Sequence, residues 1–223
     1  MDLEIGRNAG FSVPACLGAT RLQQRQDGKL ISAMQAFDYS MLTDADLGPV
    51  QQALSRGEKT ITGYIPAQAL QFVLHNYKPL ADRGILEPNW MLAYLHASHL
   101  NDAPLSLLQE IFNACDKRIL QKQYPIPALP YLSGTRFSLF RGCAGPDHRM
   151  GMSWLTSLDK AIWYAAHHAT YYNLDNVAVY AAVVDRDQIY CCGGHYDFDY
   201  IVCPTTWWRV DVPRSEFRID RPR

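Results

Sequence analysis

Apolar residues recur at helical spacing through residues 1–123. Pro66 opens one such segment, because proline is well tolerated in the first turn of a helix. The apolar face of this segment comprises Ala67, Leu70, Val73, Leu74 and Tyr77. We expect the helix to end before Pro79, since the residue ahead of a proline is biased away from helical geometry.

Three further segments within residues 1–123 also predict helices. Residues 44–55, which follow Thr43, predict a short helix. Asn89 is placed to cap a helix over residues 89–98, because its side chain can accept a hydrogen bond from the first turn. Pro104 opens another helix, and its apolar stripe comprises Leu107, Leu108, Ile111, Phe112, Cys115 and Ile119. The pattern fits a packing scaffold and equally a region that recognises a substrate.

The pattern changes after a proline-rich stretch at residues 124–130, which we interpret as part of a connector over residues 124–134. Proline removes a backbone donor and fixes φ, so it interrupts helix and sheet alike. Strands are predicted at residues 137–141 and, in an apolar run expected to be covered on both faces, at 177–184. Shorter strands are predicted at residues 188–192, 196–202 and 205–212.

One helix interrupts these strands. Ser157 is placed to cap it, and Asp159 suits the positive end of its dipole. Its predicted buried face comprises Leu158, Ala161, Ile162, Ala165 and Ala169. The chain therefore predicts an α+β fold: a helical region over residues 1–123, the connector, and a mainly sheet domain over residues 135–223.

The composition narrows the class of protein. Hydrophobic residues make up 48% of the 223 residues, which is enough for a packed core, and the formal net charge is -1. Such a balance lacks the positive surface of non-specific nucleic-acid binding. We find neither an apolar run of membrane-spanning length nor the layout of a signal peptide, and we expect a cytoplasmic protein. The six cysteines contain no Cys-x-x-Cys pair and are expected as reduced, mostly buried thiols.

Arg141 is the first residue that could carry chemistry. It ends an apolar strand and is followed by Gly142, where a guanidinium can hold a phosphate or carboxylate through two parallel hydrogen bonds. The alternative interpretation is that Arg141 simply points into solvent at the end of the strand.

A hydroxyl cluster follows, with Ser153 and Thr156 ahead of the helix cap. Ser153 lies too far upstream to cap that helix. Trp154 beside it could offer a flat face to a ligand ring, or it could belong to the core.

Asp197 and Asp199 stand two apart on a predicted strand, so both carboxylates should project from one face. Such a pair can grip ribose hydroxyls and stabilise a developing sugar cation, as carboxylates do in glycoside cleavage. A solvated edge strand is the alternative interpretation.

Other constellations are weaker. Cys191, Cys192 and His195 lack the second ligand pair of a zinc site, so we expect no metal. Ser153 does not stand in a Gly-x-Ser-x-Gly elbow, which disfavours a serine hydrolase.

In order, these pieces resemble the ADP-ribosyltransferase superfamily of the Arg–Ser–Glu, cholera-toxin-like type, and its small bacterial and phage members in particular. The resemblance covers about residues 131–212. It is carried by Phe140-Arg141-Gly142, Gly151-Met152-Ser153-Trp154, Ala161 with Trp163-Tyr164-Ala165, and Asp197-Phe-Asp199-Tyr-Ile-Val202.

The resemblance implies an NAD-binding fold of two small sheets, with NAD as substrate in a cleft between them. Arg141 would hold a phosphate or the adenylate ribose, helped by Gly142 and Thr156. Ser153 would brace the nicotinamide ribose, and Trp154 or a nearby aromatic would flank the nicotinamide. Asp199 would stabilise the charge that develops as nicotinamide leaves, and Asp197 would orient the acceptor.

The activity implied is mono-ADP-ribosylation of a protein target. The motif departs from the family in two places: the acidic residue is Asp199 rather than Glu, and Leu155 stands where Thr is common. Two alternatives therefore remain, a binding or inhibitory protein that has lost the chemistry, and an NAD glycohydrolase toxin with water as acceptor.

Overall fold

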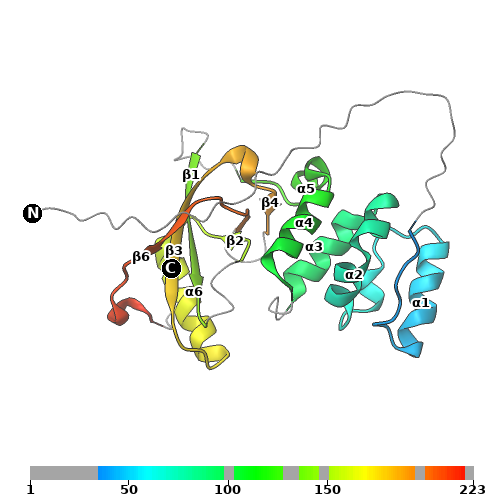
Figure 1. The fold of residues 1–223 in the computed structure, drawn as a ribbon, viewed down its shortest axis with the longest axis horizontal. Helices are drawn as coiled ribbons and strands as arrows, with labels where there is room; N and C mark the ends of the chain where they lie inside the picture. Colours follow the sequence, from blue (N-terminus) through cyan, green and yellow to red (C-terminus); the bar gives the residue numbers. More distant parts are fainter. Residues whose placement is uncertain (1–34, 98–102, 128–135, 146–150, 194–198, 219–223) are drawn as a thin grey trace, which may run out of the picture. The chain divides into compact units, whose positions relative to one another are not determined.

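A computed structural model describes residues 35–97, 103–127, 136–145, 151–193 and 199–218. All of them fall within residues 34–223, one of the two units into which the chain divides. Over these ranges the chain is α+β, with helices before the first strand and two antiparallel sheets after it (Figure 1). The α-helices are α1 (Asp44–Ser55), α2 (Ala69–Asp82), α3 (Leu86–His96), α4 (Leu105–Ala114), α5 (Lys117–Gln123) and α6 (Leu158–Tyr171). The strands are β1 (Arg136–Cys143), β2 (Ser153–Trp154), β3 (Ala178–Asp185), β4 (Cys191–Cys192), β5 (Tyr200–Ile201) and β6 (Trp207–Val210).

The helix predicted over residues 44–55 is confirmed by α1, but the predicted end of the next helix is wrong. Helix α2 continues through Pro79 to Asp82. Pro79 is buried, as are Phe72, Val73 and Leu80 of the same helix. Packing of this apolar face offsets the one backbone hydrogen bond that a proline removes.

Asn89 does not cap a helix, which corrects the second expectation. It lies inside α3 and is fully buried. Its amide Nδ2 donates to the carbonyl oxygens of Lys59 and Ile85, and its Oδ1 accepts from the backbone N–H groups of Ile61 and Thr62 at 2.8 and 3.0 Å. The Asn89 side chain, predicted to cap its own helix, thus binds backbone groups nearly 30 residues earlier in the chain.

Asn89→Ala is expected to lower the free energy of unfolding by about 2 kcal/mol, because two buried N–H groups lose their acceptor. Chemical denaturation measures the loss. Gln51→Ala, an amide removed from an exposed position of α1, is the matched control and should change stability by less than about 0.5 kcal/mol. Equal losses of stability in the two variants would show that the buried hydrogen bonds of Asn89 do not stabilise the fold.

The apolar stripe predicted to run from Leu107 to Ile119 is divided between two helices. Helix α4 ends at Ala114, and the Asp116 side chain caps α5 by accepting a hydrogen bond from the backbone N–H of Arg118 at 2.8 Å. Ile119, placed beyond this break, is 39% exposed. A capping aspartate therefore ended the periodicity earlier than the apolar pattern indicated.

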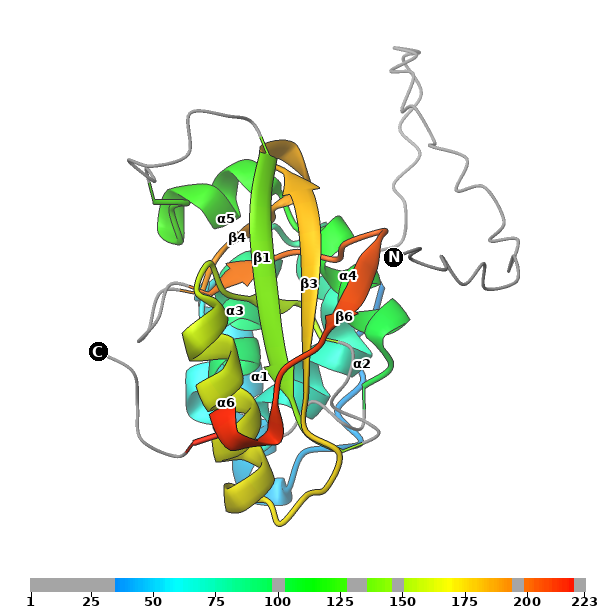
Figure 2. The same ribbon diagram turned by 90° about the vertical axis from the view of Figure 1, so that its left-hand side faces the viewer.

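The first sheet contains β1, β3 and β6 in that order, all antiparallel (Figure 2). The strands predicted at residues 137–141 and 177–184 are confirmed by β1 and β3. Helix α6 packs on the face of β1 that carries Phe140 and Gly142. The opposite face, which carries Leu139, points toward the second sheet.

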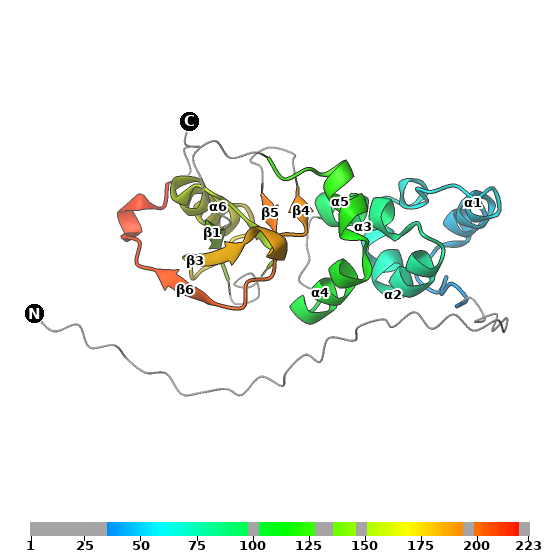
Figure 3. The ribbon, with the colours of Figure 1, turned by 90° about the horizontal axis from the view of Figure 1, so that it is seen from above.

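The second sheet contains β2, β5 and β4 in that order, with two residues in each strand. Strands β4, β5 and β6 are shorter than the sequence predicted, and β2 lies where no strand was predicted. Phe140 and Leu155 exchange backbone hydrogen bonds at 2.7 Å, which joins β1 to the end of β2. The second sheet lies between the first sheet and helices α3 and α5 (Figure 3).

The core of the helical region continues into the second sheet, because Met152, Cys191 and Ile201 belong to it. The Cys191 thiol contacts Met91 of α3 at 3.8 Å, and the rings of Phe112 and Tyr190 lie 5.2 Å apart. The predicted connector over residues 124–134 is described only as far as residue 127. None of the helices in the described ranges has the length and apolar character needed to cross a bilayer.

Candidate functional site

The pairing of β2 with β5 separates Ser153 from Trp154. Ser153 lies opposite Ile201, and Trp154 lies opposite Tyr200. Neighbouring residues of a strand point to opposite faces of the sheet. Trp154 and Tyr200 therefore face the first sheet, whereas Ser153 and Ile201 face the helices.

Trp154 is a core residue, which corrects its expected role as an open stacking face. It is 1% exposed and packs in one cluster with Phe137, Leu139 and Tyr200. Its indole N–H donates to the carbonyl oxygen of Gly151 at 3.1 Å. The same cluster fills the space between the two sheets, where the resemblance placed a cleft for NAD.

Ser153 meets the helical region directly. Its Oγ and the hydroxyl of Tyr94, from α3, lie 2.9 Å apart and share a hydrogen bond. Tyr94 is 5% exposed, and its ring packs edge-on against Phe112 with centroids 5.2 Å apart. The serine singled out by the motif is thus held by a residue some sixty positions earlier in the chain.

Arg141 is brought to the same place from β1. It shares the strand face of Leu139, toward the second sheet, and its Nη1 donates to the carbonyl oxygen of Ser153 at 2.8 Å. Gly151 lies against the guanidinium, and a Cβ added there would overlap it. The hydrogen bond to the Ser153 carbonyl oxygen therefore orients the guanidinium. Gly151 leaves room for it because glycine has no side chain.

Asp199 directly precedes β5 and is half-buried. Its carbonyl oxygen accepts from the N–H of Gly193 at 2.7 Å, which continues the pairing of β4 with β5 by one more rung. A Cβ added to Gly193 would overlap the Asp199 carboxylate. Asp199 thus occupies the strand face of Ile201 and Ser153, the face toward α3. Asp197 lies outside the described residues.

The pKa of the Tyr94 phenol depends on burial and on its polar neighbours. Burial raises the pKa of the Tyr94 phenol to about 12; the Ser153 hydrogen bond and the Arg141 charge act to lower that pKa, and the Asp199 charge acts to raise it. Arg141 donates to the Ser153 carbonyl oxygen, and Asp199 shares the strand face of the Ser153 side chain. Arg141, Ser153, Asp199 and Tyr94 form what we call the Tyr94 cluster.

Gly142 and Thr156 are placed differently. A Cβ on Gly142 would overlap the backbone carbonyl oxygen of Ala161 in α6, so the glycine is required for helix packing rather than by a ligand. Thr156 is exposed. Ser157 caps α6 as predicted, with its Oγ accepting from the backbone N–H of Lys160 at 3.3 Å.

Sequence reasoning missed Tyr94, Gly151 and Gly193. Tyr94 stands in an apolar helical run and carries no local signal of a role elsewhere. Gly151 is part of the quoted motif and Gly193 follows the strand predicted at residues 188–192, but only the tertiary structure shows which side chain each one accommodates.

The five cysteines within the described ranges are free thiols. Cys115, Cys143, Cys191, Cys192 and Cys203 form no disulfide, and all but Cys203 are buried. Burial, with Cys192 and Asp199 nearby, raises the pKa of Cys191 to about 12, which keeps it protonated at neutral pH. Across the residues that the structure describes, no three His, Cys, Asp or Glu side chains gather to hold a metal ion. His195 lies outside those residues.

A cavity of about 690 Å³ lies away from the Tyr94 cluster. It is formed by residues 174–179 and by the segment from Arg209 to Phe217, and it includes Asp175 and Arg214.

Comparisons with known proteins give no relative: no family model, no curated protein and no solved structure matches this chain.

Proposed function

We propose that this protein binds NAD at the Tyr94 cluster and transfers ADP-ribose from it to a protein acceptor, with release of nicotinamide. One observation carries the proposal. Arg141 from β1 donates to the Ser153 carbonyl oxygen, and Ser153 Oγ lies 2.9 Å from the buried Tyr94 hydroxyl. Asp199 beside β5 shares the strand face of Ser153, although 58 residues separate Arg141 from Asp199. An anion-binding group, a hydroxyl and a carboxylate are what recognition of a diphosphate-linked ribose needs.

Arg141 takes the anionic part of the substrate. Its direction is set by the Ser153 carbonyl oxygen, so less side-chain freedom is lost when the diphosphate binds. The Ser153 side chain lies on the helix-facing side of the second sheet and takes the nicotinamide ribose.

Asp199 acts on the bond that breaks. As the bond between ribose C1′ and the nicotinamide nitrogen breaks, its electron pair leaves with nicotinamide and positive charge develops on the ribose. A carboxylate fixed beside that charge lowers the barrier without having to reorganise. The nucleophile of the acceptor then bonds to C1′ and its proton passes to solvent water.

A second candidate is an NAD-binding protein without turnover. Two observations favour it: the Trp154 ring is committed to the core, and Asp199 is one methylene shorter than the glutamate of the motif. This candidate predicts NAD binding with no nicotinamide released. An NAD glycohydrolase would instead release free ADP-ribose when no acceptor protein is present.

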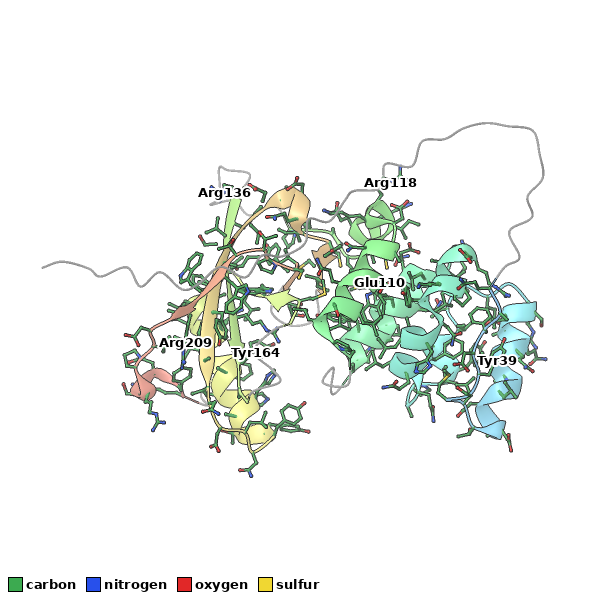
Figure 4. All side chains as sticks on the ribbon, in the orientation of Figure 1. Tyr39, Glu110, Arg118, Arg136, Tyr164 and Arg209 are labelled. Carbon is green, nitrogen blue, oxygen red and sulfur yellow. The ribbon has the colours of Figure 1, made fainter. Side chains whose placement is uncertain are left out.

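Arg141→Ala is expected to weaken NAD binding by about 10- to 100-fold, because a charged hydrogen-bonding contact contributes roughly 1.5–3 kcal/mol. Calorimetry with NAD measures the affinity, and labelled NAD with cell lysate measures the transfer. Arg136→Ala is the matched control. Arg136 begins the same strand, is largely exposed and pairs with Asp185 at 3.6 Å (Figure 4).

The wild-type protein and the Arg136 variant should bind NAD alike and label the same lysate proteins. Absence of NAD binding by the wild-type protein would overturn the proposed function. Binding that survives unchanged in Arg141→Ala would remove Arg141 from the site.

A further inference from the structure

We propose that Tyr94 is a positioning residue of the NAD site: its hydroxyl holds Ser153 Oγ in place and links the helical region to the residues that bind the substrate. This inference rests on the proposed function and goes beyond the Arg–Ser–acid motif, which contains no residue of the first 123 positions.

The first argument is the contact itself. Tyr94 Oη lies 2.9 Å from Ser153 Oγ, and the backbone carbonyl of the same serine accepts from Arg141 at 2.8 Å. One residue is thus held at its side chain from α3 and at its main chain from β1. Removing the Tyr94 hydroxyl leaves Ser153 Oγ free to turn away from the substrate.

The second argument is the rigidity of the support. The Tyr94 ring lies 5.5 Å from the Trp90 ring and 5.2 Å from the Phe112 ring, both of which are fully buried. Helix α3 is in turn anchored to β4 through the contact of Met91 with Cys191. A hydroxyl on so fixed a ring loses little conformational entropy when it orients its partner.

The third argument is the effect of the neighbouring charges on the Tyr94 phenol. Both Arg141 and Asp199 act on the Tyr94 phenol, with opposite signs. A protonated phenol can hold Ser153 Oγ without adding a net charge to the site. The helical region therefore supplies part of the NAD site and is more than a scaffold beside it.

The test compares two tyrosines at the same contact between helices and sheet. Tyr94→Phe removes the hydroxyl that holds Ser153. Tyr190→Phe removes a hydroxyl that donates to Asn113 Oδ1 of α4 at 2.5 Å, and Asn113 is not a residue of the cluster. Calorimetry with NAD and initial rates of nicotinamide release give Kd, KM and kcat for each variant.

We expect Tyr94→Phe to raise the Kd and KM for NAD about fivefold, the effect of one lost hydrogen bond, while Tyr190→Phe stays within about twofold of the wild type. Because Tyr94 acts through Ser153, the double variant Tyr94→Phe/Ser153→Ala should bind no more weakly than Ser153→Ala alone.

Three results would overturn the positioning role while leaving the proposed function standing. They are wild-type affinity in Tyr94→Phe, equal losses in the Tyr94 and Tyr190 variants, and losses that multiply in the double variant. A wild-type protein that binds no NAD would overturn the proposed function, and the role of Tyr94 in it.

Discussion

Asp199→Asn is expected to slow nicotinamide release by about 100- to 1,000-fold while NAD binding changes only a few-fold. The amide keeps the shape of the side chain and its place against Gly193, so the substrate can still bind. In the proposed mechanism it removes the negative charge that would stabilise the developing sugar cation, and the loss of one preorganised electrostatic group costs that much in turnover. Nicotinamide release is followed at saturating NAD, and affinity by calorimetry.

Gly193→Ala tests the same carboxylate without changing its chemistry. The added methyl group would overlap the Asp199 carboxylate, and the side chain must move to avoid it. We expect turnover to fall in this variant too, because the charge is displaced from the reacting carbon. Asp185→Asn, which removes a partly exposed carboxylate from β3, is the control and should leave turnover unchanged.

Turnover that is equal in the wild type and in Asp199→Asn would remove Asp199 from the chemistry. NAD binding by both proteins with no turnover in either would support the binding protein instead.

Gly142→Ala is expected to lower the free energy of unfolding by about 3 kcal/mol, close to the upper range for overpacking a well-packed site. The added methyl group would overlap the backbone carbonyl oxygen of Ala161, so α6 must move away from β1. Phe140, Ala165 and Val179 pack at this contact and would lose part of their burial. Thermal unfolding should show a melting temperature lower by about 6–12 °C.

Gly63→Ala is the matched control, since nothing lies within 4 Å of a Cβ built there. It should change stability by less than about 1 kcal/mol. If Gly142 serves the ligand instead of the packing of α6, the Gly142 variant will keep its melting temperature and lose only NAD affinity.

Local patterns in the sequence were enough for much of the fold. The apolar run at residues 177–184 predicted a strand covered on both faces, and β3 is buried along most of its length. Ser157 predicted the start of α6 because a cap depends on its nearest neighbours alone. Pro79 and Asn89 were misinterpreted because burial against distant residues changed what each one does.

The candidate site also combines features that local patterns predicted with features that depend on distant residues. The order of Arg141, Ser153 and Asp199 along the chain indicated that the three residues act together. Strand alternation alone could have shown that Ser153 and Trp154 face opposite ways, since neighbours on a strand never share a face. It could not have shown which of the two faces is filled by core.

By itself the sequence determined the α+β class, the main strands and the cap of α6, because these depend on spacing and local chemistry. Only the tertiary structure decided that Trp154 belongs to the core, that Gly142 makes room for α6, and that Tyr94 reaches Ser153. The physical reason is that burial and long-range hydrogen bonds join residues far apart in the chain, and no local pattern records which partner a side chain will meet.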